Sequence, residues 1–492
     1  MTARDRFSRP PADHRPSELE QTEYDVIVLG AGSTGENVAS RAGAGGLSVL
    51  AVEAELVGGD CSYWACMPSK ALLRPIEALA DARRIDGAKQ GVTGRLDVEA
   101  VLARRDSFTS GWKDDSQVDW LDGEDIALVR GHARLTGVRE VEVEGADGDR
   151  VTLTARHAVA VCVGSESATP PIDGLDTVGA WSSRDATSAA EAPGRLTVIG
   201  GGVVGVEMAT AWAALGSQVT MLAMEDRLLE RMEPQVGAKV RASLEATGVT
   251  VRTGVRAQTA RRDGHTVNVT LADGDEIEGD QLLVAAGRVP RTSDLGLDVV
   301  GLEPGAALET DDSLRVQGVD GGWLYAAGDC AGRAMLTHMG KYQARICGDV
   351  IAARATGRAE HTEAWQQMAA TADHDAVPQV VFSDPPAASV GLNLEQALDR
   401  GLRVRLVEQD LGSVAGAALY VDGYDGWAGL VVDQDRRVVV GATFVGPAVA
   451  ELLHAATVAV VGEVPIDRLW HAVPSYPTIS EVWLRLLESY GL

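Results

Sequence analysis

The sequence predicts an α/β protein in which two Rossmann-type domains are followed by a C-terminal α+β domain. Three observations lead to this fold class. A strand, a glycine-rich turn and a helix begin at Tyr24, the same pattern returns at Arg195, and from about Val377 the chain changes to short alternating strands with one apolar helix. Two such turns are far more specific than one, because chance would have to supply strand, glycine spacing and helix twice.

The composition is that of a folded protein of several domains. The 492 residues, 45% of them apolar, suffice for two to four domains with well-buried cores. The net charge of −27, from 44 basic and 71 acidic residues, disfavours nucleic acid or an anionic membrane surface as a partner. Residues 1–22 are polar and lack the apolar core of a signal peptide, so we expect a disordered tail. Only five cysteines occur, which argues against a secreted disulfide framework and favours a cytoplasmic protein.

The first glycine turn carries the signature of a dinucleotide site. Gly30 permits the tight turn after the strand, Gly32 lets the backbone approach a pyrophosphate, and Gly35 lets the next helix pack closely on the strand. The N-terminus of that helix would hold the phosphates. A second strand ends in Glu53, whose carboxylate would accept hydrogen bonds from the adenosine ribose. The predicted contacts of this nucleotide are Gly30, Gly32, Ser33, Thr34, Gly35, Glu53 and Gly59.

Two cysteines follow directly, in the segment GGDCSYWACMPSK from Gly58 to Lys70. If a helix begins near Cys61, one turn brings the sulfurs of Cys61 and Cys66 onto the same face, where a disulfide can close. The positive end of that helix would lower the pKa of a thiolate. The alternatives are two packed cysteines without a redox role, or half of a zinc site. The neighbouring dinucleotide turn favours a flavin beside a redox disulfide.

The segment between the two glycine turns reads as helices and then strands. From about Ala71 to Gly111, apolar residues at helical intervals predict one or two solvent-facing helices. From Val141 to Val163, alternating residues around turn signals predict a hairpin or meander, and we place a domain boundary near Ser165.

The second glycine turn, Gly200 to Gly205, predicts a second dinucleotide site. At the end of its next strand, a carboxylate would favour NAD and an arginine NADP, but Ala223 and Met224 occupy these positions. Arg227 and Arg231 lie nearby and could reach a 2′-phosphate, which favours NADPH slightly, although either could be a surface ion-pair partner. The strand at LLVAAGR closes this domain. The predicted contacts are Gly200, Gly202, Val203, Val204, Gly205 and Gly287.

The segment WLYAAGDC returns the chain to the first domain. It predicts a strand that ends at Asp329, where the carboxylate could bind a ribitol or ribose hydroxyl, although such an aspartate is more often a turn residue. A helix-like run follows. The strands after Val377 predict an α+β domain with an oligomerisation surface.

Past residue 22, these motifs together resemble the FAD-dependent pyridine nucleotide-disulfide oxidoreductases related to glutathione reductase, lipoamide dehydrogenase and mercuric reductase. The resemblance implies that the first turn, Glu53 and Asp329 hold FAD, that the second turn holds NAD(P)H, and that the C-terminal domain forms a homodimer. It also implies that Cys66 is the charge-transfer thiolate beside the flavin and Cys61 the thiol that meets substrate. Lys70 would pair with Glu207 beside the flavin, and Thr337 and His338 would contact the flavin ring.

The sequence departs from that family in its last segment. Family disulfide reductases carry a histidine before Pro-Thr and a glutamate shortly after, contributed across the dimer to protonate the leaving thiolate. Here Tyr476 occupies the histidine position while Glu481 matches, and a phenol with a pKa of about 10 is a poor proton shuttle at neutral pH. His471, five residues upstream, could substitute, although a packed or surface histidine is the more common role of such a residue. The C-terminus ends in ESYGL, without the vicinal cysteines of mercuric reductase or the redox tail of large thioredoxin reductases.

We therefore expect an enzyme that passes electrons from NAD(P)H through FAD to the Cys61–Cys66 disulfide and on to a small-molecule disulfide or related acceptor. The alternative is a reductase of quinones or metal ions that takes electrons directly from the flavin, and a third hypothesis is a scaffold subunit. The expected domains are FAD-binding at 23–165 and 290–370, NAD(P)H-binding at 166–289, and dimerisation at 371–492.

Overall fold

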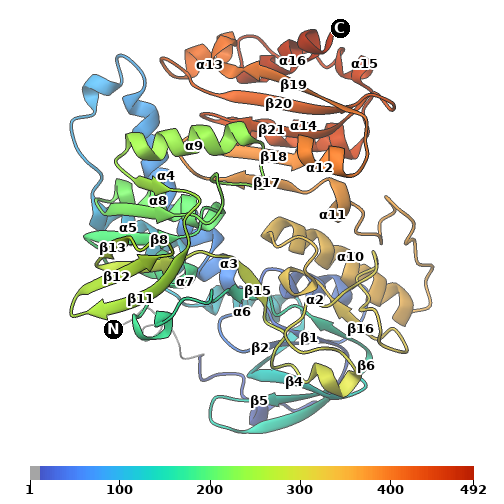
Figure 1. Ribbon diagram of the computed structural model, residues 1–492. Helices are drawn as coiled ribbons and strands as arrows, with labels where there is room; N and C mark the ends of the chain where they lie inside the picture. The colour runs from blue at the N-terminus through green and yellow to red at the C-terminus, as the bar shows by residue number, and fades with distance from the viewer. Residues whose placement is uncertain (1–10) are drawn as a thin grey trace. The chain divides into compact units, whose positions relative to one another are not determined.

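The structure is a computed structural model that describes residues 11–492. The chain divides into two compact units (Figure 1). Among the described residues, the first comprises 11–68, 106–168 and 288–374, and the second comprises 69–105, 169–287 and 375–492. Each unit therefore gathers three separate stretches of the chain.

A seven-stranded sheet forms the centre of the first unit. The strands β3, β2, β1 and β6 run parallel, β16 adds a further parallel strand beside β6, and β5 and β4 continue from β6 as an antiparallel meander. The long strand β6 belongs to both parts, since its first half pairs with β5 and its second half with β16. The bounds are β1 (Glu23–Leu29), β2 (Val49–Glu53), β3 (Ile126–Arg130), β4 (His132–Gly137), β5 (Glu140–Glu144), β6 (Arg150–Val161) and β16 (Leu324–Ala326).

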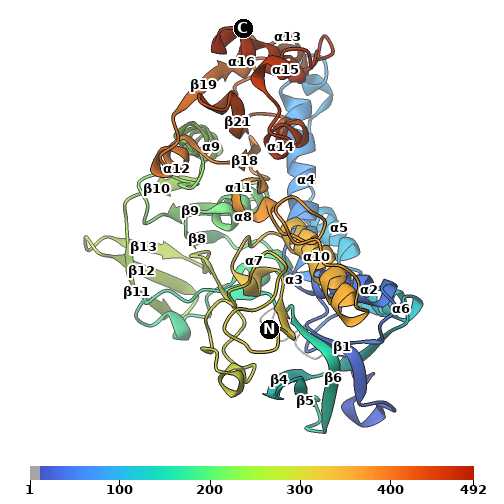
Figure 2. The ribbon, with the colours of Figure 1, turned by 90° about the vertical axis from the view of Figure 1, so that its right-hand side faces the viewer.

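Alternate residues of β1 face two separate apolar clusters, as strand geometry requires. Val26 and Val28 face the cluster under helices α2 (Gly35–Ala44) and α10 (Thr337–Ala355), and Ile27 and Leu29 face the cluster that includes the meander. Helices α2 and α10 lie side by side on the sheet (Figures 1 and 2). The remaining elements of this unit are α3 (Gly59–Tyr63), α6 (Asp115–Gly123), β7 (Ser165–Ser167) and β15 (Arg288–Pro290), with β7 paired to β15.

The predicted tail falls partly outside the described residues, because residues 1–10 are not described. Residues 11–22 make specific contacts with the first unit. Arg130 Nε donates to Asp13 Oδ1 at 2.7 Å, and Ser17 N donates to Asp149 Oδ2 at 3.0 Å. This segment also contains a short 3-10 turn, Pro16–Glu18.

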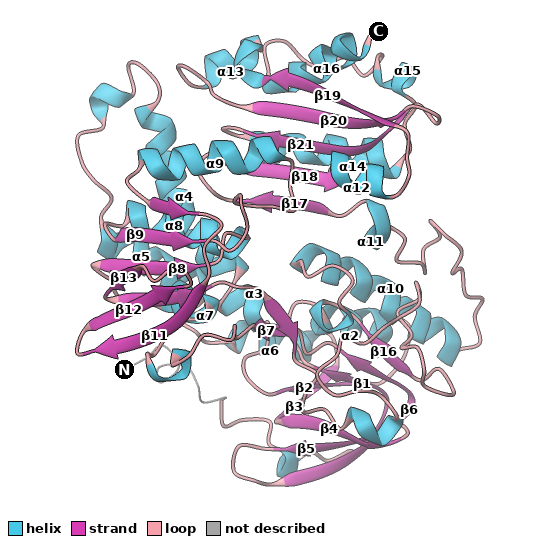
Figure 3. Ribbon diagram, in the orientation of Figure 1, coloured by secondary structure: helices cyan, strands magenta, loops and turns pink. Residues whose placement is uncertain are grey.

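The second unit contains the second Rossmann sheet, a parallel sheet in the order β10-β9-β8-β14, beside an antiparallel sheet in the order β11-β12-β13 (Figure 3). The bounds are β8 (Arg195–Ile199), β9 (Gln218–Leu222), β10 (Thr250–Arg252), β11 (Ala257–Asp263), β12 (Thr266–Leu271), β13 (Glu276–Gly279) and β14 (Gln281–Val284), with helices α5 (Val98–Phe108), α7 (Ser183–Ser188), α8 (Val203–Ala214) and α9 (Pro234–Ala246).

Helix α4 (Cys66–Arg83) begins in the first unit and continues into the second. We predicted that the helices between Ala71 and Gly111 face solvent, but Leu72, Leu73 and Val101 are buried in the large apolar cluster of the second unit. The prediction holds for the polar face of α4, where Arg74 and Glu77 form an ion pair with side chains 56% and 40% exposed, while the apolar positions share a buried cluster with residues of α8.

A five-stranded antiparallel sheet in the order β17-β18-β21-β20-β19 completes the second unit. Its helices include α14 and α16, and the ring of Phe444 on β21 contacts that of Trp483 on α16. The bounds are β17 (Pro378–Val381), β18 (Ala387–Gly391), β19 (Val404–Asp410), β20 (Trp427–Asp433), β21 (Val438–Val445), α11 (Ala372–Asp375), α12 (Leu394–Asp399), α13 (Ala415–Tyr420), α14 (Leu453–Val461), α15 (Ile466–Leu469) and α16 (Val482–Tyr490). Helix α11 straddles the boundary between the units.

Candidate active site

The first glycine turn has the backbone geometry that a bound pyrophosphate needs. Gly30 has φ +91°, and a Cβ there would lie 2.6 Å from the carbonyl oxygen of Cys162 at the end of β6. Gly59 has φ +59°, and a Cβ there would lie 2.9 Å from Gly32 Cα. Side chains at these positions would therefore clash with neighbouring backbone, so glycine is needed for the close packing around the turn.

Glu53 lies at the end of β2, beside this turn. Its Oε2 accepts a hydrogen bond from Ala31 N at 2.7 Å and its Oε1 accepts one from Glu55 N at 2.8 Å. The carboxyl is buried, and burial raises its pKa to about 7, against the effect of the two backbone donors. Each oxygen retains a lone pair, so the group can accept hydrogen bonds from two ribose hydroxyls.

Asp329 lies three residues after β16, in a loop that begins at Gly328. Ser165 Oγ donates to Asp329 Oδ2 at 2.5 Å, and burial raises the pKa of this carboxyl. Thr34 fits against the loop, since a Cβ on Gly328 would lie 2.8 Å from Thr34 Oγ1. The glycine turn, Glu53 and Asp329 thus belong to one unit, and their arrangement fits a flavin adenine dinucleotide.

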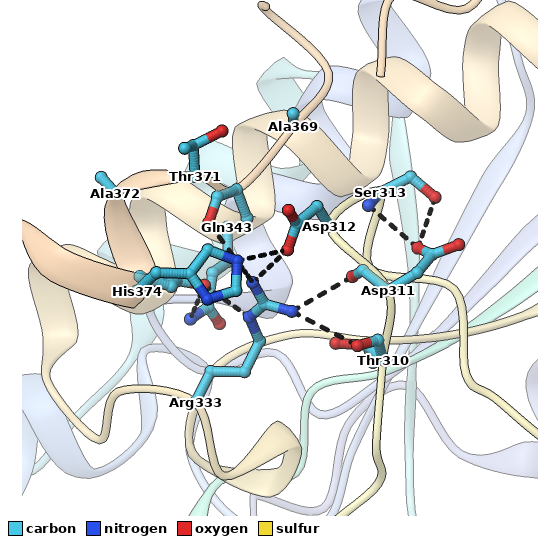
Figure 4. Close-up of polar contacts among 12 residues, drawn as sticks. Thr310, Asp311, Asp312, Ser313, Arg333, Gln343, Ala369, Thr371, Ala372 and His374 are labelled. Atoms are coloured by element: carbon cyan, nitrogen blue, oxygen red, sulfur yellow. Dashed lines mark hydrogen bonds and ion pairs between the residues drawn. The ribbon is translucent and has the colours of Figure 1, made fainter. Parts of the chain in front are cut away.

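Gln343 and Arg333 belong to a polar network that contacts the backbone of the Asp329 loop; Figure 4 shows the part of this network around Arg333. Gly328 N donates to Gln343 Oε1 at 2.7 Å, and Gln343 Nε2 donates to Asp373 Oδ2 at 3.0 Å. Arg333 bridges two carboxylates, with Nε 2.8 Å from Asp373 Oδ2 and Nη2 2.6 Å from Asp312 Oδ1. Gln343 has 0% exposed surface, so the loop backbone is fixed by a partner that water cannot replace.

Arg288 connects this loop to the cysteine segment. Its Nη2 donates to Asp60 Oδ2 at 2.8 Å, its Nε donates to Ser165 Oγ at 2.7 Å, and Nε lies 4.0 Å from Asp329 Oδ2. Asp60 immediately precedes Cys61 in α3. Sequence reasoning treated Arg288 only as the end of a strand. The sequence did not indicate that Arg288 would contact Asp60 and Ser165, because these residues lie 228 and 123 residues away from it.

The two cysteines are close together. Contrary to our prediction, they do not lie on one turn of a single helix. Cys61 lies in α3, the chain breaks from helix at Trp64, and Cys66 is the first residue of α4. Pro68 explains the break: it has no N–H for the carbonyl of Trp64, and its ring would clash with that carbonyl in a continuous helix, whereas it is tolerated in a first turn.

Both cysteines are thiols in this structure. The Cys61 thiol is hydrogen-bonded to Cys66, and this contact together with burial raises the pKa of Cys61. Cys66 Sγ lies 3.1 Å from Thr337 Oγ1 at the first residue of α10. Cys66 also occupies the N-terminus of an 18-residue helix, whose dipole favours a thiolate there.

Lys70 and Glu207 form the ion pair expected from the resemblance. Lys70 Nζ lies 2.7 Å from Glu207 Oε2, and Phe382 N donates to Glu207 Oε1 at 3.0 Å. The ammonium also lies 4.8 Å from the centroid of the Phe382 ring. The side chain of Glu207 is 5% exposed, so without this partner it would be a buried unpaired charge. His338, which we predicted beside the flavin with Thr337, is the second residue of α10.

The second glycine turn precedes α8 as predicted. Gly200 has φ +121° and packs against the carbonyl of Ala285, and Gly202 caps α8, whose first turn contains Val203, Val204 and Gly205; Gly287 has φ +119°. After β9, Met224 is 57% exposed and its Sδ lies 3.5 Å from Arg256 Nη2. Arg227, in contrast, donates to Glu230 O at 2.7 Å. Arg256, which sequence reasoning missed, is the arginine that contacts the strand end.

The C-terminal segment exposes two of the three residues expected to act at a dimer interface. Tyr476 is 76% exposed and Val473 85%, and His471 is exposed as well. Glu481 is buried: its Oε1 accepts from Arg485 Nη2 at 2.5 Å, while Oε2 has no hydrogen-bond partner among residues 11–492. These are the features of a surface that a second subunit covers.

No helix within residues 11–492 combines the length and the apolar character needed to cross a bilayer. In the same part of the chain, no cluster of three or more His, Cys, Asp or Glu side chains is arranged to hold a metal ion.

Comparison with known proteins agrees with this arrangement. Residues 24–344 match the family model described as "Pyridine nucleotide-disulphide oxidoreductase", and residues 377–486 match its dimerisation domain. A dihydrolipoyl dehydrogenase of Thermus scotoductus is 33% identical, over 95% of this chain and 97% of its own. A mercuric reductase of Streptomyces lividans is 32% identical, over 94% of each chain. Among solved structures, the flavoprotein disulfide reductase RclA from Escherichia coli, in its Cu(II) complex, superposes with a TM-score of 0.80 at 22% identity, covering 95% of this chain and 99% of that one.

Proposed function

This chain belongs to the pyridine nucleotide-disulphide oxidoreductase family, and we propose on this basis that its Cys61–Cys66 pair relays electrons from NAD(P)H and FAD to a small disulfide. The protein is an FAD-dependent oxidoreductase that uses NAD(P)H, and its C-terminal domain forms a homodimer. The observation that carries the proposal is the pair of adjacent thiols behind the FAD site, with Cys66 against Thr337 at 3.1 Å.

The two thiols would have different tasks. When bound, FAD accepts a hydride equivalent from the nicotinamide and passes two electrons to a disulfide. Cys66, at the start of α4 and in contact with Thr337, is the sulfur that would receive these electrons as a thiolate stabilised by the helix dipole. Cys61 would attack the substrate disulfide and release one of its thiols.

Other residues would hold the cofactors. We propose that the backbone of Gly30, Gly32 and Gly59 leaves room for the FAD pyrophosphate, that Glu53 binds the adenosine ribose, and that Asp329 binds the ribitol. Ser33, Thr34, Gly35, Thr337 and His338 complete this site. Gly200, Gly202, Val203, Val204, Gly205 and Gly287 would hold NAD(P)H, and Lys70 with Glu207 would place one fixed charge pair beside the flavin.

We propose NADPH as the preferred donor. Neither Ala223 nor Met224 supplies the carboxylate that would bind the 2′-hydroxyl of NADH. Arg256 is exposed, and its guanidinium lies 3.5 Å from Met224 Sδ, where it can bind a 2′-phosphate.

We also propose a cytoplasmic location for the protein. The proposed domains are an FAD-binding domain of residues 23–165 and 290–370, an NAD(P)H-binding domain of residues 166–289 and a dimerisation domain of residues 371–492.

The test is an anaerobic titration of the purified enzyme with NADPH. The two-electron reduced wild type should show a long-wavelength band from a thiolate beside the flavin, and the band should be absent from Cys66→Ser. A wild type that reduces its flavin without this band would contradict the proposed role of the cysteines.

A second candidate function is direct reduction of quinones or metal ions by the flavin, and Tyr476 favours it. The residue offers no imidazole to protonate a leaving thiolate, and it is 76% exposed. If Cys61→Ser keeps full turnover with quinones while the wild type ignores lipoamide, glutathione disulfide and mycothiol disulfide, this second function replaces the first.

A further inference from the structure

Residues 13–17, here called the N-terminal strap, precede the part of the chain that matches the family, and the proposed mechanism gives them no role. The strap is fixed to the first unit at two places. Arg15 Nη1 lies 3.2 Å from Asp147 Oδ2, in the turn between β5 and β6. At the end of β3, Arg130 N donates to His14 O at 2.8 Å. The second of these contacts brings the strap to the edge of the sheet on which the FAD site is built.

The side chain of Arg130 connects the strap to the interior of the unit. Its Nε donates to Asp13 Oδ1 of the strap at 2.7 Å, and its Nη1 lies 2.9 Å from Asp114 Oδ2. Nη1 also donates to Glu55 O at 3.3 Å. The side chains of Arg130 and Asp114 are 4% and 3% exposed, whereas that of Asp13 is 50% exposed. The planar guanidinium therefore bridges one exposed and one buried carboxylate in fixed directions.

Asp114 is the last of three consecutive residues that hold the cysteine segment at both ends. Its Oδ2 accepts a hydrogen bond from Val57 N at 2.8 Å. At the other end, Trp112 Nε1 donates to Tyr63 O at 3.2 Å, and the Tyr63 hydroxyl donates to Lys113 O at 3.3 Å. Trp112 and Tyr63 also belong to one small buried apolar cluster. The backbone between positions 57 and 63, which contains the thiol proposed to meet substrate, is therefore fixed at its two ends.

We propose that Arg130 is a positioning residue for the cysteine segment, and that the N-terminal strap holds Arg130 in the orientation that this task needs. Asp13 fixes the guanidinium, the guanidinium fixes the Asp114 carboxylate, and that carboxylate fixes the backbone that leads into Gly59 and Cys61. The inference rests on the proposed roles of Gly59 beside the FAD pyrophosphate and of Cys61 as the thiol that meets substrate. Without the strap carboxylate, the guanidinium loses one of its two ion-pair partners and the whole segment gains freedom.

The experiment uses the full-length, FAD-loaded protein and measures amide hydrogen exchange by mass spectrometry in the peptide that spans residues 56–64. Exchange at Val57 reports directly on the hydrogen bond to Asp114. The second measurement is the Kd for FAD, read from flavin fluorescence. Neither needs turnover, so a failure of this inference is distinct from a failure of the proposed electron transfer, which the NADPH titration tests.

Asp13→Ala should speed exchange in this peptide about 3- to 10-fold and raise the Kd for FAD about 2- to 5-fold. Half of the Asp13 side chain is exposed, so we expect this variant to fold. Asp13→Glu keeps the carboxylate and should bring both quantities back to within about 2-fold of the wild type. Asp147→Ala removes the same charge from the other contact of the strap and is the matched control, with an expected change below about 2-fold.

A double variant tests whether the strap acts through Arg130. The ammonium of Arg130→Lys cannot bridge two carboxylates as the guanidinium does, so exchange in the peptide should rise in this variant by itself. Adding Asp13→Ala should then change it by less than about 2-fold. Equal effects of Asp13→Ala and Asp147→Ala, no effect of Asp13→Ala, or additive effects in the double variant would overturn the proposal. If Arg130→Lys does not fold, the contrast between Asp13→Ala and Asp147→Ala decides the question alone.

Discussion

Replacing Gln343 by leucine should loosen the loop that presents Asp329 to FAD. Gln343 accepts from Gly328 N and donates to Asp373 Oδ2, and it is fully buried. Leucine has a similar volume but makes neither hydrogen bond. A neutral hydrogen bond contributes about 0.5–1.5 kcal/mol and one to a charged group about 1.5–3 kcal/mol. The free energy of unfolding should therefore fall by about 2–4 kcal/mol.

Two measurements check this prediction. An unfolding entropy of about 2.1 cal/mol/K per residue, applied to all 492 residues, converts the loss to a decrease in Tm of about 2–4 °C. If about 1–2 kcal/mol of the loss falls on the Asp329 loop, the Kd for FAD, read from flavin fluorescence, should rise about 5- to 30-fold. Arg345→Met, on an exposed position of the same helix, is the control. An unchanged Kd for FAD in Gln343→Leu would refute the idea that this network positions the flavin loop.

Three further predictions concern other buried or charged contacts. Glu207→Gln should lower the free energy of unfolding, measured in urea, by about 1–3 kcal/mol, because Lys70 loses its ion-pair partner. A smaller change would show that the ion pair does not contribute to stability. Arg256→Met should weaken NADP⁺ binding about 10-fold in calorimetry and leave NAD⁺ within about 2-fold, whereas Arg252→Met, whose guanidinium is 2.7 Å from Asp275 Oδ2, should change neither. Glu36 has a folded-state pKa of about 7 against an ordinary value of 4.5, so its contribution to apoprotein stability falls as pH rises through this window; Glu36→Gln should flatten that dependence, and parallel curves would contradict it.

The two Rossmann turns could be predicted because their information is local. The glycine spacing predicts the positive φ of Gly30 and Gly200. Apolar patterns a few residues long predict the strand and the helix on either side. The cysteine segment was only half predictable. The spacing indicates that Cys61 and Cys66 meet, but the break between α3 and α4 depends on a proline two residues after Cys66.

The polar contacts that fix the site could not be predicted in this way. Arg288 donates a hydrogen bond to Asp60, which lies 228 residues away in the sequence, and Arg333 donates one to Asp373, 40 residues away. Nothing in a single sequence tells such arginines from those that pair on the surface, because the difference is burial, and burial is decided by the tertiary fold. Arg256 and Glu36 were missed for the same reason.

The half of the mechanism that faces substrate depends on the segment around Tyr476. Tyr476 occupies the position where the resemblance places a histidine, while Glu481 keeps a buried Oε2 without a partner in the described part of the chain. Tyr476→His would place an imidazole, with a pKa of about 6.5, at the position from which the related reductases protonate a leaving thiolate. If the disulfide is the natural acceptor, turnover with glutathione disulfide or lipoamide should rise by about 10- to 100-fold in this variant and acquire a dependence on a group that titrates between about pH 6 and 7. Quinone turnover should not change, because it needs no thiolate to leave. A rise in both activities would mean that Tyr476 only restricts access, and no rise in either would mean that the acceptor is not reached through Cys61.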